Sequence, residues 1–105
     1  MTFDPEDPNS NLYLTRALQA LASANTRKLV ELLALQPRSV IDLCNVFDLK
    51  TSNMADLMQA LCEAGLASQV KSRDGIIYVF EERGINLARS WLDRITSIVG
   101  GAGHS

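Results

Sequence analysis

The chain has 105 residues, a length that fits one domain with a modest core and needs no disulfide or metal to hold it together. Hydrophobic residues make up 47% of the sequence and charged residues 21%, so a disordered or fibrous chain is excluded. The most apolar stretch, residues 29–35, is too short to span a bilayer, and the acidic start lacks the features of a signal peptide. We therefore expect a cytoplasmic protein that does not enter a membrane.

The net charge of −2 is unevenly distributed along the chain. Asp4, Glu6 and Asp7 fall within the first ten residues, which contain no base, so residues 11–105 carry a net charge of +1. A body with this charge can carry a local basic face, but it does not bind nucleic acid through bulk charge alone.

The two ends of the chain differ in composition from its middle. Residues 1–9 contain Pro5 and Pro8 among acidic residues with little to bury, and residues 100–105 are rich in glycine, so we expect both ends to be flexible. The body between them, residues 10–99, has no internal repeat and no low-complexity run, which predicts a single folded domain.

Apolar residues at helical spacing predict four short helices in the first part of the body. The residues that we expect to cap them are, in chain order, Asn9, Ser10 or Asn11; Asn25 or Thr26; Ser39; and Thr51 or Ser52. Pro37 ends the second helix and Gly65 ends the fourth. A brief turn at residues 48–50 joins the third and fourth helices into a tight pair.

A hairpin and a long helix complete the body. Residues 66–71 and 76–80 are short strand candidates, and the Asp-Gly pair between them favours a hairpin. From Glu82 on, apolar residues recur at helical spacing: Ile85, Ala88, Trp91, Leu92, Ile95 and Val99. The expected fold is mainly α with a small β-hairpin, in the order α-α-α-α-β-β-α, which is that of a winged helix-turn-helix.

From Leu14 to Ile95 the sequence resembles the ArsR/SmtB-type family of bacterial regulators. The matching segments are LQALASANTRKLVELLAL, RSVIDLCNVFDLKTSNMADLMQALCEAGL, SRDGIIYVF and SWLDRI. The resemblance implies a homodimer, paired through its first and last helices, that represses transcription by binding a palindromic operator in double-stranded DNA.

On this resemblance the fourth helix enters the major groove and reads base edges with short polar side chains. Met54, Met58 and Leu61 are expected to face inward. The outward side chains that suit base contacts are Thr51, Ser52, Asn53 and Gln59, with Asp56 as an acceptor for a cytosine amino group. The expected phosphate contacts come from Arg38, Lys50, Lys71 and Arg73. An ordinary solvated helix face has the same composition, so the residues alone leave both interpretations open.

Two residues of the fourth helix depart from the family pattern. The family usually has a basic residue followed by His where Asp56 and Leu57 stand here. The charges of Lys50, Asp56 and Glu63 give the fourth helix and the residue before it a net charge of about −1. Phosphate contacts need positive charge. The alternative hypothesis is therefore a winged-helix interaction module that has lost or weakened DNA binding and holds a protein partner through Leu57 and its acidic neighbours.

The apolar residues of the outer helices predict the dimer interface. They are Leu14, Ala17 and Leu18 of the first helix and Ala88, Trp91, Leu92 and Ile95 of the last. Trp91 is the expected anchor because aromatic residues are enriched at the centres of interfaces.

No metal site or cofactor is expected. Where arsenic-sensing members of the family carry a Cys-x-Cys, this chain has Ser39 and Ile41, and only Cys44 matches the later thiol. The sole histidine, His104, lies in the glycine-rich tail.

Cys44 and Cys62 admit two interpretations. In a chain without an export signal they are expected to be reduced. They are either small hydrophobic residues beside the core or a redox pair on the two DNA-reading helices, which would make the protein a thiol-based redox-responsive repressor. The chain contains no P-loop, zinc-protease or serine-hydrolase motif, so we do not expect an enzyme.

Overall fold

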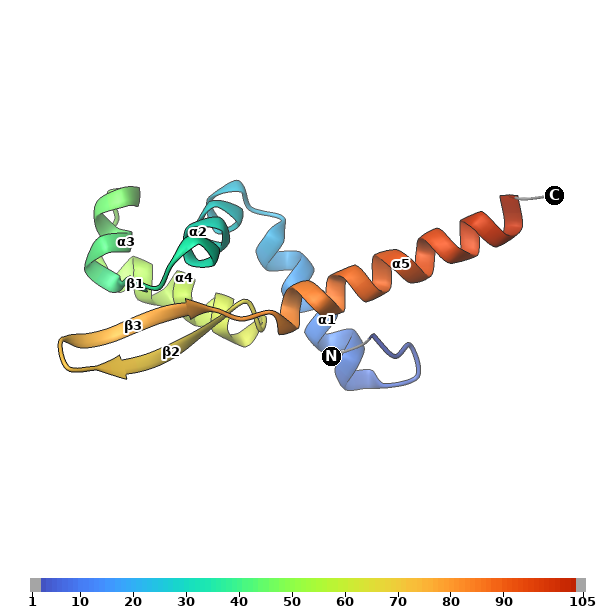
Figure 1. Ribbon diagram of the computed structural model, residues 1–105, viewed down its shortest axis with the longest axis horizontal. Helices are drawn as coiled ribbons and strands as arrows, with labels where there is room; N and C mark the ends of the chain where they lie inside the picture. Colours follow the sequence, from blue (N-terminus) through green and yellow to red (C-terminus); the bar gives the residue numbers. More distant parts are fainter. Residues whose placement is uncertain (1–2, 104–105) are drawn as a thin grey trace.

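A computed structural model describes residues 3–103 of the chain (Figure 1). The elements are, in order, α1 (Pro8–Leu21), α2 (Ala24–Leu35), β1 (Arg38–Ser39), α3 (Val40–Phe47), α4 (Thr51–Glu63), β2 (Ala67–Ser72), β3 (Gly75–Phe80) and α5 (Arg83–Gly103). Helices α1 to α4 and the hairpin gather at one end, and α5 extends away from them (Figure 1). The predicted winged helix-turn-helix is confirmed. None of the helices in residues 3–103 has the length and apolarity needed to cross a bilayer.

Three of the predicted helix starts are wrong. Asp7 caps α1, Ser23 caps α2, and Lys50 precedes α4 without a side-chain cap bond, each with the extended backbone that the cap position requires. Most of the residues that the sequence suggested as caps already lie inside helices: Asn9, Ser10, Asn11, Asn25, Thr26, Thr51 and Ser52. Ser39 caps α3 as predicted, and its Oγ accepts the amide hydrogen of Asp42 at 3.2 Å.

The acidic N-terminal segment lies against α1 and α5. Phe3 packs on a small cluster formed by Leu14, Leu87 and Ala88, and its backbone N–H donates to Ser90 Oγ at 3.0 Å. The acidic N-terminal segment therefore makes contacts with the folded body through Phe3. Its overall composition did not predict them, since only one of its residues is aromatic. Its mobility in solution stays a prediction.

The outer helices extend beyond the residues 10–99 predicted as the folded body, and the domain boundaries themselves stay a prediction. Helix α1 takes in Pro8 and Asn9, because proline suits the first helical position. Helix α5 continues to Gly103, past the tail boundary predicted at Gly100. His104 lies outside the described residues.

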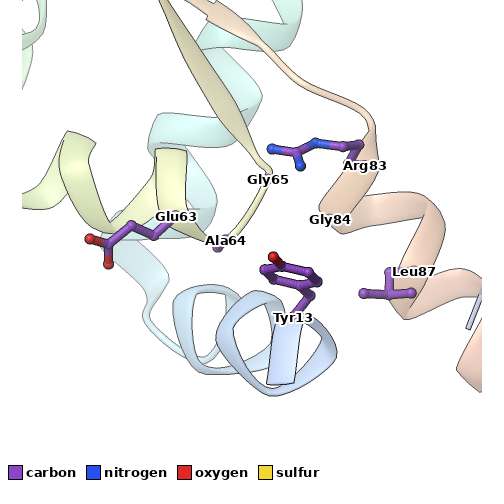
Figure 2. Close-up of a pocket in the computed structure, with 7 residues that line it drawn as sticks. All are labelled: Tyr13, Glu63, Ala64, Gly65, Arg83, Gly84 and Leu87. Carbon is purple, nitrogen blue, oxygen red and sulfur yellow. The ribbon is translucent and has the colours of Figure 1, made fainter. Parts of the chain in front are cut away.

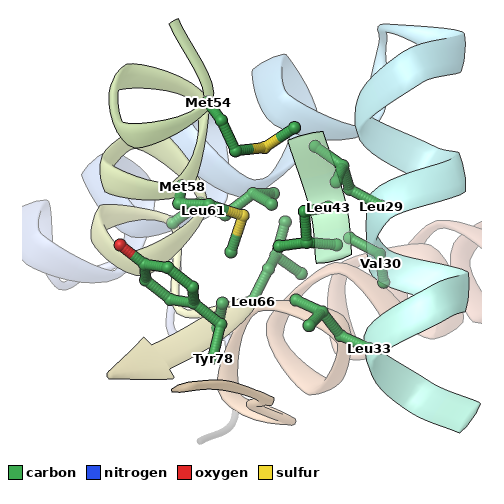
Figure 3. Packing of buried hydrophobic residues seen from close by; sticks show 11 residues of the cluster. Leu29, Val30, Leu33, Leu43, Met54, Met58, Leu61, Leu66 and Tyr78 are labelled. Carbon is green, nitrogen blue, oxygen red and sulfur yellow. The ribbon is translucent and has the colours of Figure 1, made fainter. Parts of the chain in front are cut away.

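The main core fills the space between α2, α3, α4 and the sheet (Figure 3). Its largest side chains without solvent contact are Leu29, Leu43, Met54, Met58, Leu61 and Leu66. The prediction that Met54, Met58 and Leu61 face inward is thus confirmed. Because these three residues occupy one side of α4, its opposite side faces solvent.

The sheet has three antiparallel strands in the order β1-β3-β2. Strands β2 and β3 form the predicted hairpin, with bounds that differ from the predicted ones by a residue. Strand β1 was not predicted, because two residues show no alternation of polar and apolar positions. It pairs Arg38 with Tyr78 and Ser39 with Ile77, and so attaches the start of α3 to the β2–β3 hairpin, which is the wing of this fold.

The end of α4 and the start of α5 meet in a close backbone contact (Figure 2). Gly65, in the left-handed region with φ 70°, accepts the N–H of Gly84 at 2.8 Å. A Cβ atom on Gly84 would lie 2.5 Å from the carbonyl oxygen of Ala64 and 2.8 Å from a methyl carbon of Leu66. Figure 2 shows Tyr13 of α1 beside this contact. We call the contact between Gly65 and Gly84 the glycine junction.

We expect Gly84→Ala to lower the free energy of unfolding by about 1–3 kcal/mol, because backbone as well as side chain must shift to admit the new methyl group. Gly100→Ala is the matched control, since a Cβ there meets nothing within 4 Å and alanine favours a helix over glycine by roughly 1 kcal/mol. Urea denaturation of the two variants measures both effects. Equal stability of Gly84→Ala and the parent would contradict the close packing.

Candidate nucleic-acid interface

The solvent-facing side of α4 carries a line of polar side chains. Successive residues of an α-helix are rotated by about 100°, so Ser52, Asp56, Gln59 and Glu63 lie along one line on the side away from Met54. All four are exposed. We call these four residues the outer stripe. Thr51 and Asn53, the other predicted base-reading residues, are also exposed and flank the stripe.

The outer stripe contains a hydroxyl, an amide and two carboxylates, and no cation. Gln59 donates from Nε2 to Glu63 Oε1 at 3.3 Å, one helical turn further along. Leu57, which the interaction-module hypothesis requires at the surface, is half-buried and packs against the main core. The exposed surface of α4 is therefore polar and rich in hydrogen-bond acceptors.

Positive charge lies on elements other than the stripe. Lys50 precedes α4, Lys71 lies on β2 and Arg73 lies in the turn of the wing, and all three are exposed. Arg38 is half-buried, and its Nε donates to the carbonyl oxygen of Leu32 at 3.4 Å. Of the four predicted phosphate contacts, three are free to reach outward and Arg38 has part of its donor capacity occupied.

A groove between α4 and the wing adjoins the outer stripe. It is lined by Ala55, Gln59, Cys62, Gln69 and Tyr78. Gln69 donates from Nε2 to Tyr78 Oη at 3.1 Å and so fixes the floor of the groove. The sequence did not predict Gln69 or Tyr78 at this site, because only the strand register places them opposite each other.

The two cysteines are free and half-buried, Cys44 on α3 and Cys62 on α4, and both pack against the main core. Burial raises the pKa of the Cys62 thiol, and the carboxylate of Glu63 raises it further. A raised pKa lowers the thiolate fraction at neutral pH, and the thiolate is the reactive form. These surroundings favour the interpretation of Cys62 as a small hydrophobic residue over that of a redox sensor.

We expect iodoacetamide to alkylate Cys62 more slowly in the folded protein than in the urea-unfolded chain near pH 8, since folding disfavours the thiolate. Glu63→Gln removes one cause of the raised pKa and is expected to speed the reaction. Peptide mass spectrometry over time measures the rate at each cysteine. Faster alkylation of Cys62 in the folded protein would contradict a thiol held in its protonated form.

Three of the predicted dimer residues, Leu14, Ala17 and Ala88, are buried within one chain, where α1 packs against α5. Trp91, the expected anchor, is half-buried and packs on the cluster that contains Leu14 and Ala88. These residues therefore stabilise the chain itself and leave little surface for a second copy. The sequence could not separate the two roles, because both use the same apolar spacing.

Exposed apolar side chains nevertheless remain on the outer helices. They include Leu18 of α1 and Leu92, Ile95, Ile98 and Val99 of α5, which are between 38% and 64% exposed. Four of these residues lie on the part of α5 that extends from the body (Figure 1). We call these four, Leu92, Ile95, Ile98 and Val99, the α5 apolar surface. Ile98 and Val99 were not among the predicted interface residues, although they follow Ile95 at helical spacing.

Among residues 3–103, no three histidine, cysteine or acidic side chains gather in a way that could hold a metal ion.

The fold and the exposed polar helix define a winged helix-turn-helix protein. Comparison with known proteins finds solved structures of similar fold. No protein-family model matches the chain, and no curated protein matches it by sequence. An ArsR-like transcriptional regulator from Rhodococcus sp. RHA1 is 20% identical over 90% of this chain and 89% of its own, with a TM-score of 0.78. A possible transcriptional regulator for arsenical resistance is 26% identical over 76% of this chain and 83% of its own, with a TM-score of 0.68.

A third similar structure comes from Mycobacterium bovis. It is a homodimeric winged helix-turn-helix DNA-binding domain of a possible ArsR-family transcriptional regulator, 21% identical over 99% of this chain and 96% of its own, with a TM-score of 0.66. These similarities confirm the resemblance to ArsR/SmtB-type regulators on which the sequence-based interpretation was built.

Proposed function

We propose that the protein is a dimeric transcriptional repressor of the ArsR/SmtB type that acts in the cytoplasm by binding a palindromic operator, without a metal site and without enzymatic activity. The observation that carries this proposal is the exposed polar face of α4, together with exposed cations just before α4 (Lys50) and on the hairpin (Lys71 and Arg73). Base readout by polar groups and backbone contact by flanking cations is the division of labour found at protein–DNA interfaces. The homodimeric DNA-binding domain from Mycobacterium bovis supports the same assignment.

The α5 apolar surface supports dimerisation. Within residues 3–103 this apolar helix face is left exposed to water, and a second copy that covers it removes apolar area from water, which lowers the free energy. A two-fold dimer would present two copies of α4, which is the arrangement that a palindromic operator requires. We propose that two chains pair through this surface, with Leu18 of α1 at its margin.

We expect Ile95→Glu to convert the dimer into a folded monomer, because it places a charge in the centre of the α5 apolar surface without touching the buried residues of the chain. Ser97→Glu introduces the same charge on the opposite side of α5 and is the matched control. Sedimentation velocity gives the mass, and circular dichroism checks the fold. A dimeric Ile95→Glu variant would rule out pairing through this surface. Trp91→Glu is a poorer test, since Trp91 also packs within the chain.

DNA binding is tested by titrating salt against duplex fragments that include the promoter region of the protein's own gene. We expect binding that weakens linearly with the logarithm of salt concentration, since each phosphate contact releases counterions. Lys71→Gln and Arg73→Gln should weaken binding to all sequences and lower the salt slope by about 1 each. Arg94→Gln, on α5, is the control that should leave the slope unchanged.

The negative charge of the outer stripe favours a second candidate, a winged-helix module that binds a protein instead of DNA. Carboxylates near a phosphate backbone oppose binding, whereas they attract a basic protein surface. The same titration distinguishes the two candidates. Absence of any salt-sensitive binding across the fragments would overturn the repressor and leave the interaction module.

A further inference from the structure

We infer that the outer stripe reads cytosine and adenine rather than guanine, with Asp56 accepting from the N4 amino group of a cytosine and Gln59, positioned by Glu63, pairing with an adenine. This inference rests on the proposed function, because it names the operator chemistry that this particular α4 recognises.

The outer stripe lacks the cation that usually reads guanine. In the major groove guanine presents two acceptors, O6 and N7, and proteins usually read them with the paired donors of Arg or Lys. The side chains of α4 from Thr51 to Glu63 include no cation. The carboxylate of Asp56 is exposed and can only accept hydrogen bonds. It would be repelled by the guanine acceptors, whereas the N4 amino group of cytosine is a donor that it can accept from.

Gln59 is the second proposed base-reading residue, and its hydrogen bond to Glu63 limits which base it can pair with. The amide has two N–H donors and one carbonyl acceptor. One donor is engaged by Glu63 Oε1 at 3.3 Å, which leaves one N–H and the carbonyl. Adenine presents one acceptor, N7, and one donor, the N6 amino group, in the major groove. The groups that Glu63 leaves available on Gln59 therefore match adenine.

The two readers are suitably spaced for neighbouring base pairs. Asp56 and Gln59 are three residues apart, which corresponds to a rise of about 4.5 Å along the helix axis. Successive base pairs are separated by about 3.4 Å. The cytosine and the adenine are thus expected at adjacent positions of each operator half-site, and the attraction to phosphate is supplied from outside the stripe by Lys50, Lys71 and Arg73.

The experiment is a selection from a library of DNA duplexes with a randomised half-site, performed with the full chain and with single variants. For the parent we expect an enriched site that contains a cytosine next to an adenine. For Asp56→Asn we expect the cytosine position alone to change to adenine, because an asparagine amide offers both a donor and an acceptor to adenine. Asp93→Asn on α5 makes the same change of charge away from α4 and should leave the enriched site unaltered.

The positioning role of Glu63 is tested in the same selection. Glu63→Ala removes the partner of Gln59, and preference for adenine over the other bases at that position is expected to fall about tenfold. Glu63→Gln keeps an acceptor for the Gln59 amide and is expected to restore the preference. A loss caused only by changed charge or lower stability would not be rescued in this way, since Glu63→Gln also removes the charge.

The outcomes separate this inference from the proposed function. An enriched site with an A·T pair at the Asp56-dependent position, which offers no cytosine amino group on either strand, would overturn the inference while leaving DNA binding intact. An Asp56→Asn variant that selects the same site as the parent would do the same. A parent that enriches no sequence and shows no salt-sensitive binding would overturn both.

Discussion

The packing of Met54, Met58 and Leu61 into the core is the constraint on which the functional surface depends. These side chains have no exposed area, and they meet Leu29 of α2 and Leu43 of α3 in one cluster. Turning α4 about its axis would expose three large apolar groups, each of which contributes about 1.5–3 kcal/mol by burial. The opposite side chains are therefore held toward solvent in a fixed order, and this order gives the outer stripe its chemical character.

A second constraint links this surface to the rest of the molecule. The glycine junction brings the backbone of α5 against the end of α4 at a distance that no larger residue permits. A second backbone contact is made by strand β1, which pairs with β3 and so attaches the start of α3 to the hairpin. Helix α4, the hairpin and α5 are thus held together by backbone contacts as well as by side-chain packing.

Much of this arrangement followed from the sequence. The apolar spacing of α4 predicted which of its residues are buried, because the pattern repeats over several helical turns. The turn residues predicted the hairpin, because two strand candidates flank a short loop. Individual caps did not follow, since Asn, Ser, Thr and Asp occur in clusters near each helix start and only the backbone conformation selects one of them. The register that places Gln69 against Tyr78, and the bond from Gln59 to Glu63, depend on tertiary structure and left no pattern in the sequence.

The length of α5 has a mechanical consequence for a dimer paired through its outer half. The helix has 21 residues, or about 30 Å, and the glycine junction attaches the rest of the fold at its first turn. In such a dimer each α5 helix would pivot about the paired surface. The centre of the α5 apolar surface lies about 12 residues, or about 18 Å, from that first turn, so a tilt of roughly 10° would displace the attached part of each chain by about 3 Å, which is close to the spacing of one base pair. In such a dimer the separation of the two α4 helices is therefore governed by how the two α5 helices cross, far from α4 itself.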